Sequence, residues 1–341
     1  ILLNVSASSV EGLNLYGDNF YFIKRHLTAI ILGAIIFNIL KNLNINFIEK
    51  FSSISMVFIT TTLFLVLTYG IVVGGSRRWI DLGIVNFQPS ELAKPLIILW
   101  VAKQISNDIT EDTDLKKFVR SIFLPLLCAF LVLLEPDYGT FASICFILFS
   151  QIFFSKIKII YPSLTIFASI LPLYFVATSS EYRLSRIETW LSRKCDLGID
   201  LLGDCFQLNQ SRIAISSGGL FGLGPGTSRA RWGSLPNSYS DFISSIIGEE
   251  YGFFGLFLLV LAFFILISTT FLIAIREKNE IKKLISVGFG SWIFFQTVIN
   301  LGGAVGIVPI TGIVLPFVSY GSSAMISIFI ALGIMYSRDY E

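Results

Sequence analysis

The chain has 341 residues and a formal net charge of +2, and its four cysteines show no CxxC spacing. Only 14% of its residues are charged, against about 25% in a soluble domain, and 54% are hydrophobic, which indicates a membrane protein. The weak charge, without a basic tail, argues against nucleic-acid binding. The single histidine argues against a multi-histidine zinc site or a Ser-His-Asp triad.

Long apolar segments follow one another along the chain. The segment 251–275 holds no charged residue, and as a helix it can cross about 30 Å of hydrocarbon. We therefore expect an all-α polytopic membrane protein. The predicted spans are 25–40, 51–73, 89–105, 119–134, 139–154, 157–178, 242–275, 283–305 and 314–336. Residues 1–10 read as the end of a truncated first span, so we expect ten spans in the intact protein.

Lysine-rich short loops place one side of the membrane in the cytoplasm, by the positive-inside rule. The outward side then includes one long loop, 179–240, within a single membrane domain, 1–341. Outward arginines are numerous, and they either bind an anionic ligand, which guanidinium groups match well, or solubilise the loops. They are Arg25, Arg77, Arg78, Arg183, Arg186, Arg193, Arg212, Arg229 and Arg231. Three of them, Arg77, Arg78 and Arg212, lie in motifs and are candidate substrate-binding residues.

The first motifs in chain order are GSRRWID at 75–81 and FQPSELAK at 87–94. Glu91 and Lys94 are three residues apart and share one helix face. An ionisable pair on a membrane helix usually faces a polar interior and serves a function. The alternative is an interfacial pair that anchors the end of the helix.

Two further motifs are rich in turn residues. In EPDYGT, at 135–140, Asp137 either binds substrate or bonds to its own backbone in a tight turn. The segment 209–226 carries five glycines in its second half, and no βαβ unit surrounds it, so a dinucleotide site is not expected. A loop that folds over a ligand, or a re-entrant segment, fits this composition.

Asp241 opens the longest apolar helix, within the motif LPNSYSDF at 235–242. Ser238 and Asp241 have the spacing of a capping box, so a helix cap is one role for Asp241. A general base on the outer face is the other, and the pattern does not separate them. Downstream, prolines and small polar residues interrupt the apolar stretch 308–323, and one of them, Ser319, is a candidate substrate-binding residue. Lipid-exposed backbone cannot stay unpaired, so this segment should be buried or line a cavity.

These motifs, in this order, resemble the SEDS family (shape, elongation, division and sporulation) over nearly the whole chain. Within it, the segment 207–229 is more similar to the cell-division branch (FtsW-like) than to the elongation branch (RodA-like). The resemblance implies a peptidoglycan glycosyltransferase in the bacterial cytoplasmic (inner) membrane, with its active face outward. It implies lipid II as substrate, and as partners a class B penicillin-binding protein and other divisome membrane proteins.

The resemblance also assigns roles to residues. The family's essential acidic residue falls on Asp241, which favours a base over a cap. Its polar pair falls on Glu91 and Lys94. The chain departs from the family at Tyr239, where a histidine is usual, and in EPDYGT, where QPDLGT is usual. It also has Gly321-Ser-Ser-Ala324 where GGSS is usual.

The function expected from this resemblance is an inverting transfer in which lipid II is both donor and acceptor. No cofactor is certain, although Mg²⁺ or Mn²⁺ would help to neutralise the departing diphosphate. A lipid II flippase is the alternative, since Glu91, Lys94 and the broken last span suit a polar path across the bilayer. A scaffold that only positions the penicillin-binding protein ranks last.

The residues alone suggest one disulfide. Cys195 and Cys205 both lie in the outward loop, and thiols in an oxidising compartment tend to pair. The pair would tie the segment that carries Arg186 and Arg193 to the block that begins at Asn209. Two unpaired cysteines are the alternative.

Overall fold

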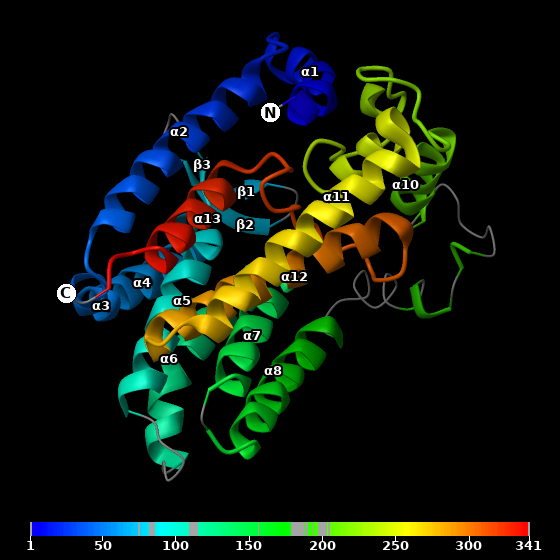
Figure 1. The fold of residues 1–341 in the computed structure, drawn as a ribbon. Helices are drawn as coiled ribbons and strands as arrows, with labels where there is room; N and C mark the ends of the chain where they lie inside the picture. The colour runs from blue at the N-terminus through cyan, green and yellow to red at the C-terminus, as the bar shows by residue number, and fades with distance from the viewer. Residues whose placement is uncertain are drawn as a thin grey trace. The chain divides into compact units, whose positions relative to one another are not determined.

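The structure is a computed structural model that describes residues 2–73, 76–81, 86–108, 115–155, 157–178, 188, 190–192, 194–196, 203 and 205–339. The helices are α1 (Leu2–Tyr16), α2 (Tyr21–Asn42), α3 (Ile45–Lys50), α4 (Ser52–Tyr69), α5 (Pro89–Asp108), α6 (Leu115–Leu134), α7 (Tyr138–Phe153), α8 (Ile160–Thr178), α10 (Phe206–Ser217), α11 (Ile243–Arg276), α12 (Glu280–Val305) and α13 (Ser322–Met335), with a short 3₁₀ helix η1 (Ala230–Trp232) (Figure 1).

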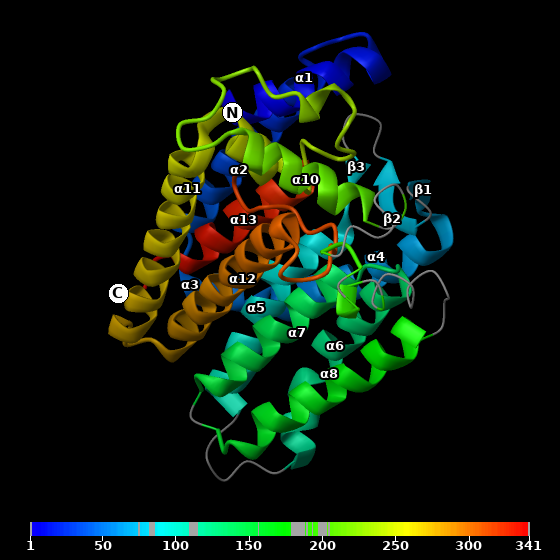
Figure 2. The same cartoon turned by 90° about the vertical axis from the view of Figure 1, so that its right-hand side faces the viewer.

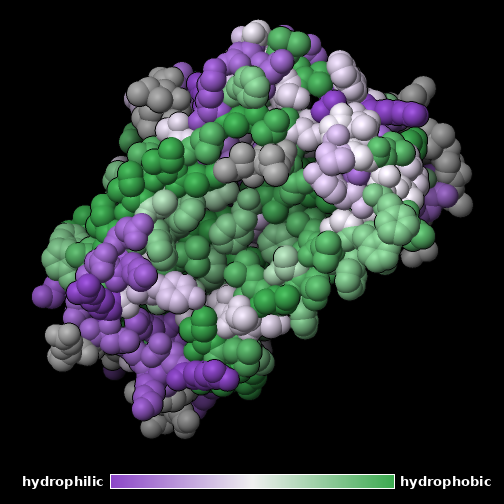
Figure 3. Space-filling view, turned by 45° about the horizontal axis from the view of Figure 1, so that its top comes forward, coloured by the Kyte–Doolittle hydropathy of each residue, from purple (hydrophilic) through white to green (hydrophobic). Residues whose placement is uncertain are grey.

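The predicted helical membrane fold is confirmed. Among the described residues, α2, α4, α6, α11 and α12 are long and apolar enough to cross a membrane, and α7, α8 and α13 are shorter apolar helices. Exposed apolar side chains form wide continuous areas of the surface, as expected for helices that face lipid (Figure 3). The chain is therefore a multi-pass membrane protein, and the count of ten spans stays a prediction.

A small antiparallel sheet was not predicted. It joins β1 (Ile71–Val73), β2 (Ser76–Asp81) and β3 (Asn86–Phe87) in the order β1-β2-β3. Ile71 pairs with Trp79, and Ile80 pairs with Phe87. The predicted span 51–73 therefore ends at Tyr69, because the β-branched and aromatic residues that follow pair as strands.

The long loop predicted at 179–240 also contains more helix than expected. The predicted glycine-rich block begins at 209, but α10 occupies Phe206–Ser217, and no glycine lies in that stretch. Only the glycine-bearing half, 218–226, is irregular. At the other end of the chain, 306–321 is irregular before α13, as the broken apolar pattern predicted.

The chain folds as two compact units, and the single membrane domain 1–341 stays a prediction. Unit 1 comprises 1–28, 175–265 and 296–321, and unit 2 comprises 29–174, 266–295 and 322–341. In unit 2, α5 is central and packs on α3, α4, α6, α7 and α13 (Figures 1 and 2). The side chain of Gln151 is fully buried there and donates to the carbonyls of Ile98 and Leu284, at 2.9 and 3.1 Å.

Candidate functional site

Asp241 lies in a tight turn immediately before α11. Its N–H donates to the carbonyl of Asn237 at 3.1 Å, and the N–H groups of Ser240 and Phe242 point to the same oxygen. Asn237 adopts φ 56°, a left-handed conformation that asparagine tolerates. Because α11 begins at Ile243, Asp241 precedes the helix and does not occupy the third position of its first turn. This placement argues against the capping-box role.

Asn300, in the last turns of α12, holds the turn at Asp241. Its side-chain amide donates to the carbonyl of Asp241 at 2.9 Å and to the carbonyl of Ile313 at 2.8 Å. Asn300 is buried, and its own Oδ1 accepts no hydrogen bond from the described residues. One amide group therefore ties the Asp241 turn to the irregular segment 306–321.

Ser319 and Tyr320 bind the two preceding carbonyls. The hydroxyl of Ser319 donates to the carbonyl of Ser240, and the hydroxyl oxygen of Ser319 accepts the N–H of Leu315 at 2.9 Å. The N–H of Tyr320 donates to the carbonyl of Tyr239 at 3.1 Å. With the bond from Asn300, three successive carbonyls of the turn each accept a hydrogen bond from 296–321. The sequence singled out Ser319 as a substrate-binding residue, and the structure gives it this positioning contact.

The carboxylate of Asp241 faces Gly312. A Cβ placed on Gly312 would lie 3.5 Å from Oδ2 of Asp241, and Gly312 has φ +72°, a conformation that favours glycine. The half-buried Asp241 carboxylate thus lies against bare backbone. A Cβ at position 312 would be in van der Waals contact with the oxygen that is the candidate base.

Tyr239 stands where the family usually has a histidine. It is half-buried and packs against the rings of Phe22 and Tyr320, with centroids 4.7 and 5.9 Å away. Burial raises the pKa of its phenol, and the negative charges of Glu11 and Asp241 raise the pKa further. Tyr239 therefore stays a neutral hydroxyl beside the Asp241 carboxylate at physiological pH.

Two acidic residues of α11 anchor the glycine-rich block. The carboxylate of Glu249 accepts the hydroxyl of Ser228 at 2.6 Å and the N–H groups of Arg229 and Ala230 at 3.0 and 3.2 Å. A Cβ on Gly222 would lie 2.1 Å from the carbonyl of Glu250. The glycines thus allow the block to dock on the first turns of α11. The carboxylate of Glu249 therefore serves this docking, a role that the sequence did not predict.

Arg212, on α10, contacts a different part of unit 1. Its Nη1 lies 2.7 Å from Oδ1 of Asp196, and its Nε donates to the carbonyl of Val305 at 3.0 Å. The structure joins Cys195 to Cys205 in a disulfide with Cα atoms 5.3 Å apart, which is the pairing that the sequence favoured. Arg186 and Arg193, which that prediction tied to the bridge, lie outside the described residues, as does Arg183.

Glu91 and Lys94 form a buried ion pair within unit 2. Nζ of Lys94 lies 2.7 Å from Oε1 of Glu91 and 4.8 Å from the centroid of the Trp292 ring. Lys94 is fully buried, so the pair is in the core of the unit and not at a helix end exposed to solvent. Oε2 of Glu91 accepts no hydrogen bond from the described residues.

Arg78 and Asp137 hold the turn between α6 and α7. Arg78 donates to the carbonyls of Glu135, at 3.1 Å, and Pro136, and its Nη1 lies 3.9 Å from Asp137. Asp137 also accepts the N–H of Thr140 at 3.1 Å and so caps α7. These contacts support the turn role of Asp137. Arg77 is exposed and donates to the carbonyl of Thr68 at 3.1 Å.

The candidate residues therefore fall into two groups. Unit 1 contains Asp241, Arg212, Ser319 and the disulfide, and unit 2 contains Arg77, Arg78, Glu91, Lys94 and Asp137. Asn300 and Gly312 were missed, although both contact Asp241. A polar side chain in the apolar α12 was the available signal for Asn300.

The family model described as "Cell cycle protein", which covers FtsW, RodA and SpoVE, matches residues 1–341. The chain belongs to this family. Its members include the probable peptidoglycan glycosyltransferases FtsW of Wigglesworthia glossinidia brevipalpis and of Buchnera aphidicola from Schizaphis graminum. The first is 32% identical over all of this chain and 90% of the relative, and the second is 34% identical over 99% and 96%.

Solved structures of the family share the fold. A chain from a study titled "Structural coordination of polymerization and crosslinking by a peptidoglycan synthase complex" matches with a TM-score of 0.75 and 25% identity, over 98% of this chain and 94% of that one. The rod shape determining protein RodA of Thermus thermophilus matches with a TM-score of 0.68 and 25% identity, over 98% and 93%. The predicted membership of the SEDS family is thus confirmed.

Proposed function

We propose that this protein is a peptidoglycan glycosyltransferase of the cell-division branch, which joins lipid II units into glycan strands. The names of its FtsW relatives support this activity. The observation that carries the proposal is the turn at Asp241, where three carbonyls are held by one segment while the carboxylate faces Gly312. A base held in this way keeps its geometry during the reaction, as catalysis by a positioned group requires.

In the proposed reaction, the 4-hydroxyl of the acceptor's N-acetylglucosamine attacks C1 of the donor's N-acetylmuramic acid. Asp241 takes the hydroxyl proton, the new C–O bond forms, and the bond from C1 to undecaprenyl diphosphate breaks. Attack from the face opposite the leaving group inverts the configuration at C1. General base catalysis of this kind is worth about 10²–10⁴-fold.

A divalent cation would help the diphosphate to leave. The described residues contain no group of three or more His, Cys, Asp or Glu side chains that could hold a metal ion. No step is therefore assigned to Mg²⁺ or Mn²⁺, and the need for either stays a prediction.

We place the active face outside the bacterial cytoplasmic membrane. The Cys195–Cys205 disulfide supports this side, because disulfides persist in oxidising compartments. Asp241 lies in the same unit, downstream of the outward loop that holds the bridge. A class B penicillin-binding protein is the proposed partner, supported by the similarity to a chain of a peptidoglycan synthase complex.

The test is the Asp241→Asn variant, purified with the class B penicillin-binding protein and supplied with fluorescent lipid II. We expect polymer formation to fall by at least about 10²-fold. The matched control is Asp18→Asn, because Asp18 is a carboxylate of the same unit, paired with Lys24 in the loop between α1 and α2. Full polymerisation by Asp241→Asn would refute the proposal.

A lipid II flippase is the second candidate, and the buried pair of Glu91 and Lys94 favours it. Buried ionisable groups in membrane helices often mark transport paths. Flipping needs no base at Asp241, so the two functions make opposite predictions. If the purified protein with its partner makes no polymer from lipid II, while it translocates lipid II in liposomes and Glu91→Gln abolishes that translocation, the flippase replaces the glycosyltransferase.

A further inference from the structure

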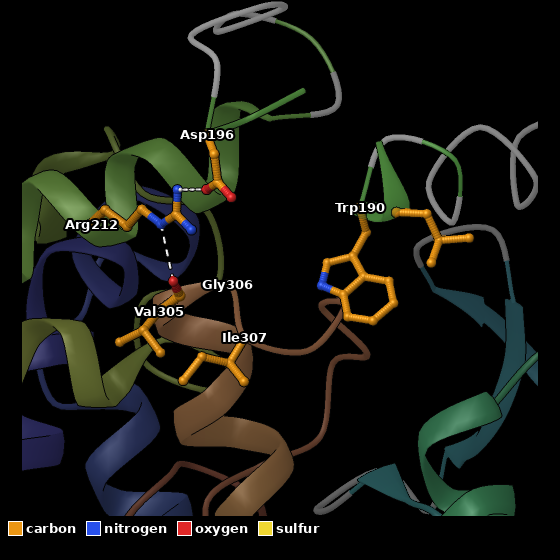
Figure 4. Close-up of a pocket in the computed structure, with 7 residues that line it drawn as sticks. Trp190, Asp196, Arg212, Val305, Gly306 and Ile307 are labelled. Atoms are coloured by element: carbon orange, nitrogen blue, oxygen red, sulfur yellow. Dashed lines mark hydrogen bonds and ion pairs between the residues drawn. The ribbon is translucent and has the colours of Figure 1, made fainter. Parts of the chain in front are cut away.

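A pocket of about 490 Å³ opens on unit 1, apart from the turn at Asp241. This volume lies within the roughly 300–1,000 Å³ range of small-molecule sites. Trp190 stands on one side of it, and Arg212 and Asp196 stand on the other (Figure 4). Leu191 and the turn Val305–Ile307 complete the lining. One wall is therefore aromatic and the opposite wall carries a charged pair.

The polar wall still offers hydrogen-bonding atoms to a ligand. Nε of Arg212 donates a hydrogen bond to the carbonyl of Val305, and Nη1 of Arg212 donates one to Oδ1 of Asp196. Its Nη2 and Oδ2 of Asp196 make no hydrogen bond to the described residues. The side chains of Arg212 and Asp196 are 34% and 46% exposed, so both can contact a molecule in the pocket.

The charged pair is fixed before any ligand binds. Asp196 follows Cys195, whose disulfide to the buried Cys205 anchors it at the start of α10, the helix that carries Arg212. Gly306 has φ +84°, and a Cβ there would lie 2.5 Å from Nη2 of Arg212. A glycine at 306 thus lets the guanidinium lie against the turn. A binding group that is held in place loses little entropy on binding.

The charges of this pocket decide which part of the substrate fits it. The carboxylate of Asp196 neutralises the guanidinium of Arg212, so the pair has no net charge to attract a diphosphate. A sugar ring is uncharged, and it presents an apolar C–H face to an aromatic ring and hydroxyl or amide groups to a polar pair. We infer that the pocket lined by Trp190, Asp196 and Arg212 binds a non-reacting sugar of the glycan strand, an inference that rests on the proposed polymerase function.

The pocket and the turn at Asp241 share supporting elements. Asn300 of α12 holds the carbonyl of Asp241, and Val305, five residues further on, holds Arg212. Five residues of α-helix rise about 7.5 Å. The hydroxyl of Ser211, next to Arg212, bonds to that of Ser245 at the start of α11. One strand of linked sugars can therefore engage both places, with the reacting sugar at Asp241 and an earlier one in the pocket.

The test uses the full chain, purified with its penicillin-binding protein, and chitotetraose as the probe. This tetramer of N-acetylglucosamine has the glycan backbone but no lipid, diphosphate or peptide. We expect Trp190→Ala to weaken its binding about tenfold by calorimetry and to shorten the strands made from lipid II, while Trp190→Phe restores both. The control is Trp232→Ala, since Trp232 is an exposed tryptophan of the same unit outside the pocket.

A second variant separates a sugar site from a diphosphate site. Asp196→Asn leaves Arg212 unneutralised, so we expect this variant to gain affinity for inorganic pyrophosphate, which the unmodified protein binds more weakly than chitotetraose. The inference is overturned if Trp190→Ala matches Trp232→Ala in both measurements, or if the unmodified protein prefers pyrophosphate. Chitotetraose binding needs no turnover, so a protein that binds it but polymerises nothing refutes only the proposed function.

Discussion

The side-chain amide of Asn300 donates to the main-chain carbonyl of Asp241 at 2.9 Å and, with its second N–H, to that of Ile313 at 2.8 Å. Both of these bonds go to main-chain carbonyls, so we assign Asn300 as a positioning residue. Asn300→Ala leaves two carbonyls without this donor, and a shift of about 1 Å in a catalytic group can cost 10²-fold in rate. We expect kcat for lipid II polymerisation to fall at least about tenfold, with a smaller change in KM.

Two measurements separate positioning from simple destabilisation. The acidic limb of the pH–rate profile should keep its midpoint in Asn300→Ala, because the base itself is still present. Asn300→Gln keeps the donor and should recover part of kcat. An unchanged kcat in Asn300→Ala would show that Asn300 does not position the base. So would a decrease in kcat that is fully explained by a lower melting temperature.

Gly312 offers an independent test of the same geometry. Gly312→Ala forces a Cβ to 3.5 Å from Oδ2 of Asp241 and places alanine at φ +72°. The backbone strain alone costs about 1–2 kcal/mol. Gly17→Ala is a matched control, because Gly17 has φ +70° and no atom within 4 Å of its Cβ position. We expect both variants to lose similar stability by thermal melting and only Gly312→Ala to lose activity beyond that. Equal activities would place the carboxylate elsewhere during catalysis.

The sequence predicted those parts of this protein that depend on local pattern. The helices follow from uncharged runs such as 251–275, and the irregular segment before α13 follows from its prolines and small polar residues. The sheet escaped prediction because β1 and β3 are three and two residues long and gain stability only by pairing with β2.

The site was predicted in the same partial way. Asp241 was found through a motif, whereas Asn300 was not, because its bond to Asp241 joins residues 59 apart in sequence. The role of Gly312 depends on which side chain lies above it, and a sequence pattern does not contain that information. The anchoring role of Glu249 depends on the three groups that donate hydrogen bonds to its carboxylate, and a sequence pattern does not show them.

Glu135 predicts a pH dependence of stability. Its carboxyl is fully buried, accepts no hydrogen bond from the described residues, and stands where the family usually has a neutral glutamine. Burial, with the charge of Asp137, raises its pKa from 4.5 to about 9, although Arg78 opposes the shift. The folded protein thus keeps the proton that the unfolded chain releases above pH 4.5. The contribution of this carboxyl to the free energy of unfolding is therefore complete below pH 4.5 and is lost progressively as the pH rises from 4.5 toward 9.

Glu135→Gln should remove this dependence. We expect the variant to gain stability relative to the unmodified protein as the pH rises toward 9, because glutamine takes up no proton on folding, whereas the raised pKa of Glu135 costs the folded protein up to about 1.4 kcal/mol for each pH unit above 4.5. Melting temperatures in detergent between pH 5 and 9 measure the effect. Asp18→Asn serves as the control, because the hydrogen bond from Lys24 lowers the pKa of the exposed Asp18, which is ionised throughout this range. Parallel curves for Glu135→Gln and the unmodified protein would contradict the prediction.

The Cys195–Cys205 disulfide closes a loop with a sequence separation of ten residues. In the chain-entropy model a bridge of this length stabilises a protein by about 2–3 kcal/mol. We expect a reducing agent, or the double change Cys195→Ser with Cys205→Ser, to lower the melting temperature. Either treatment should also weaken the ion pair between Asp196 and Arg212. The control is the double change Cys128→Ser with Cys145→Ser, since both residues are free thiols.

Non-reducing peptide mass spectrometry of protein from cells reports the Cys195–Cys205 bond directly. A fully reduced pair there would contradict both the bridge and the outward placement of its loop, because a cytoplasmic loop would keep its thiols reduced.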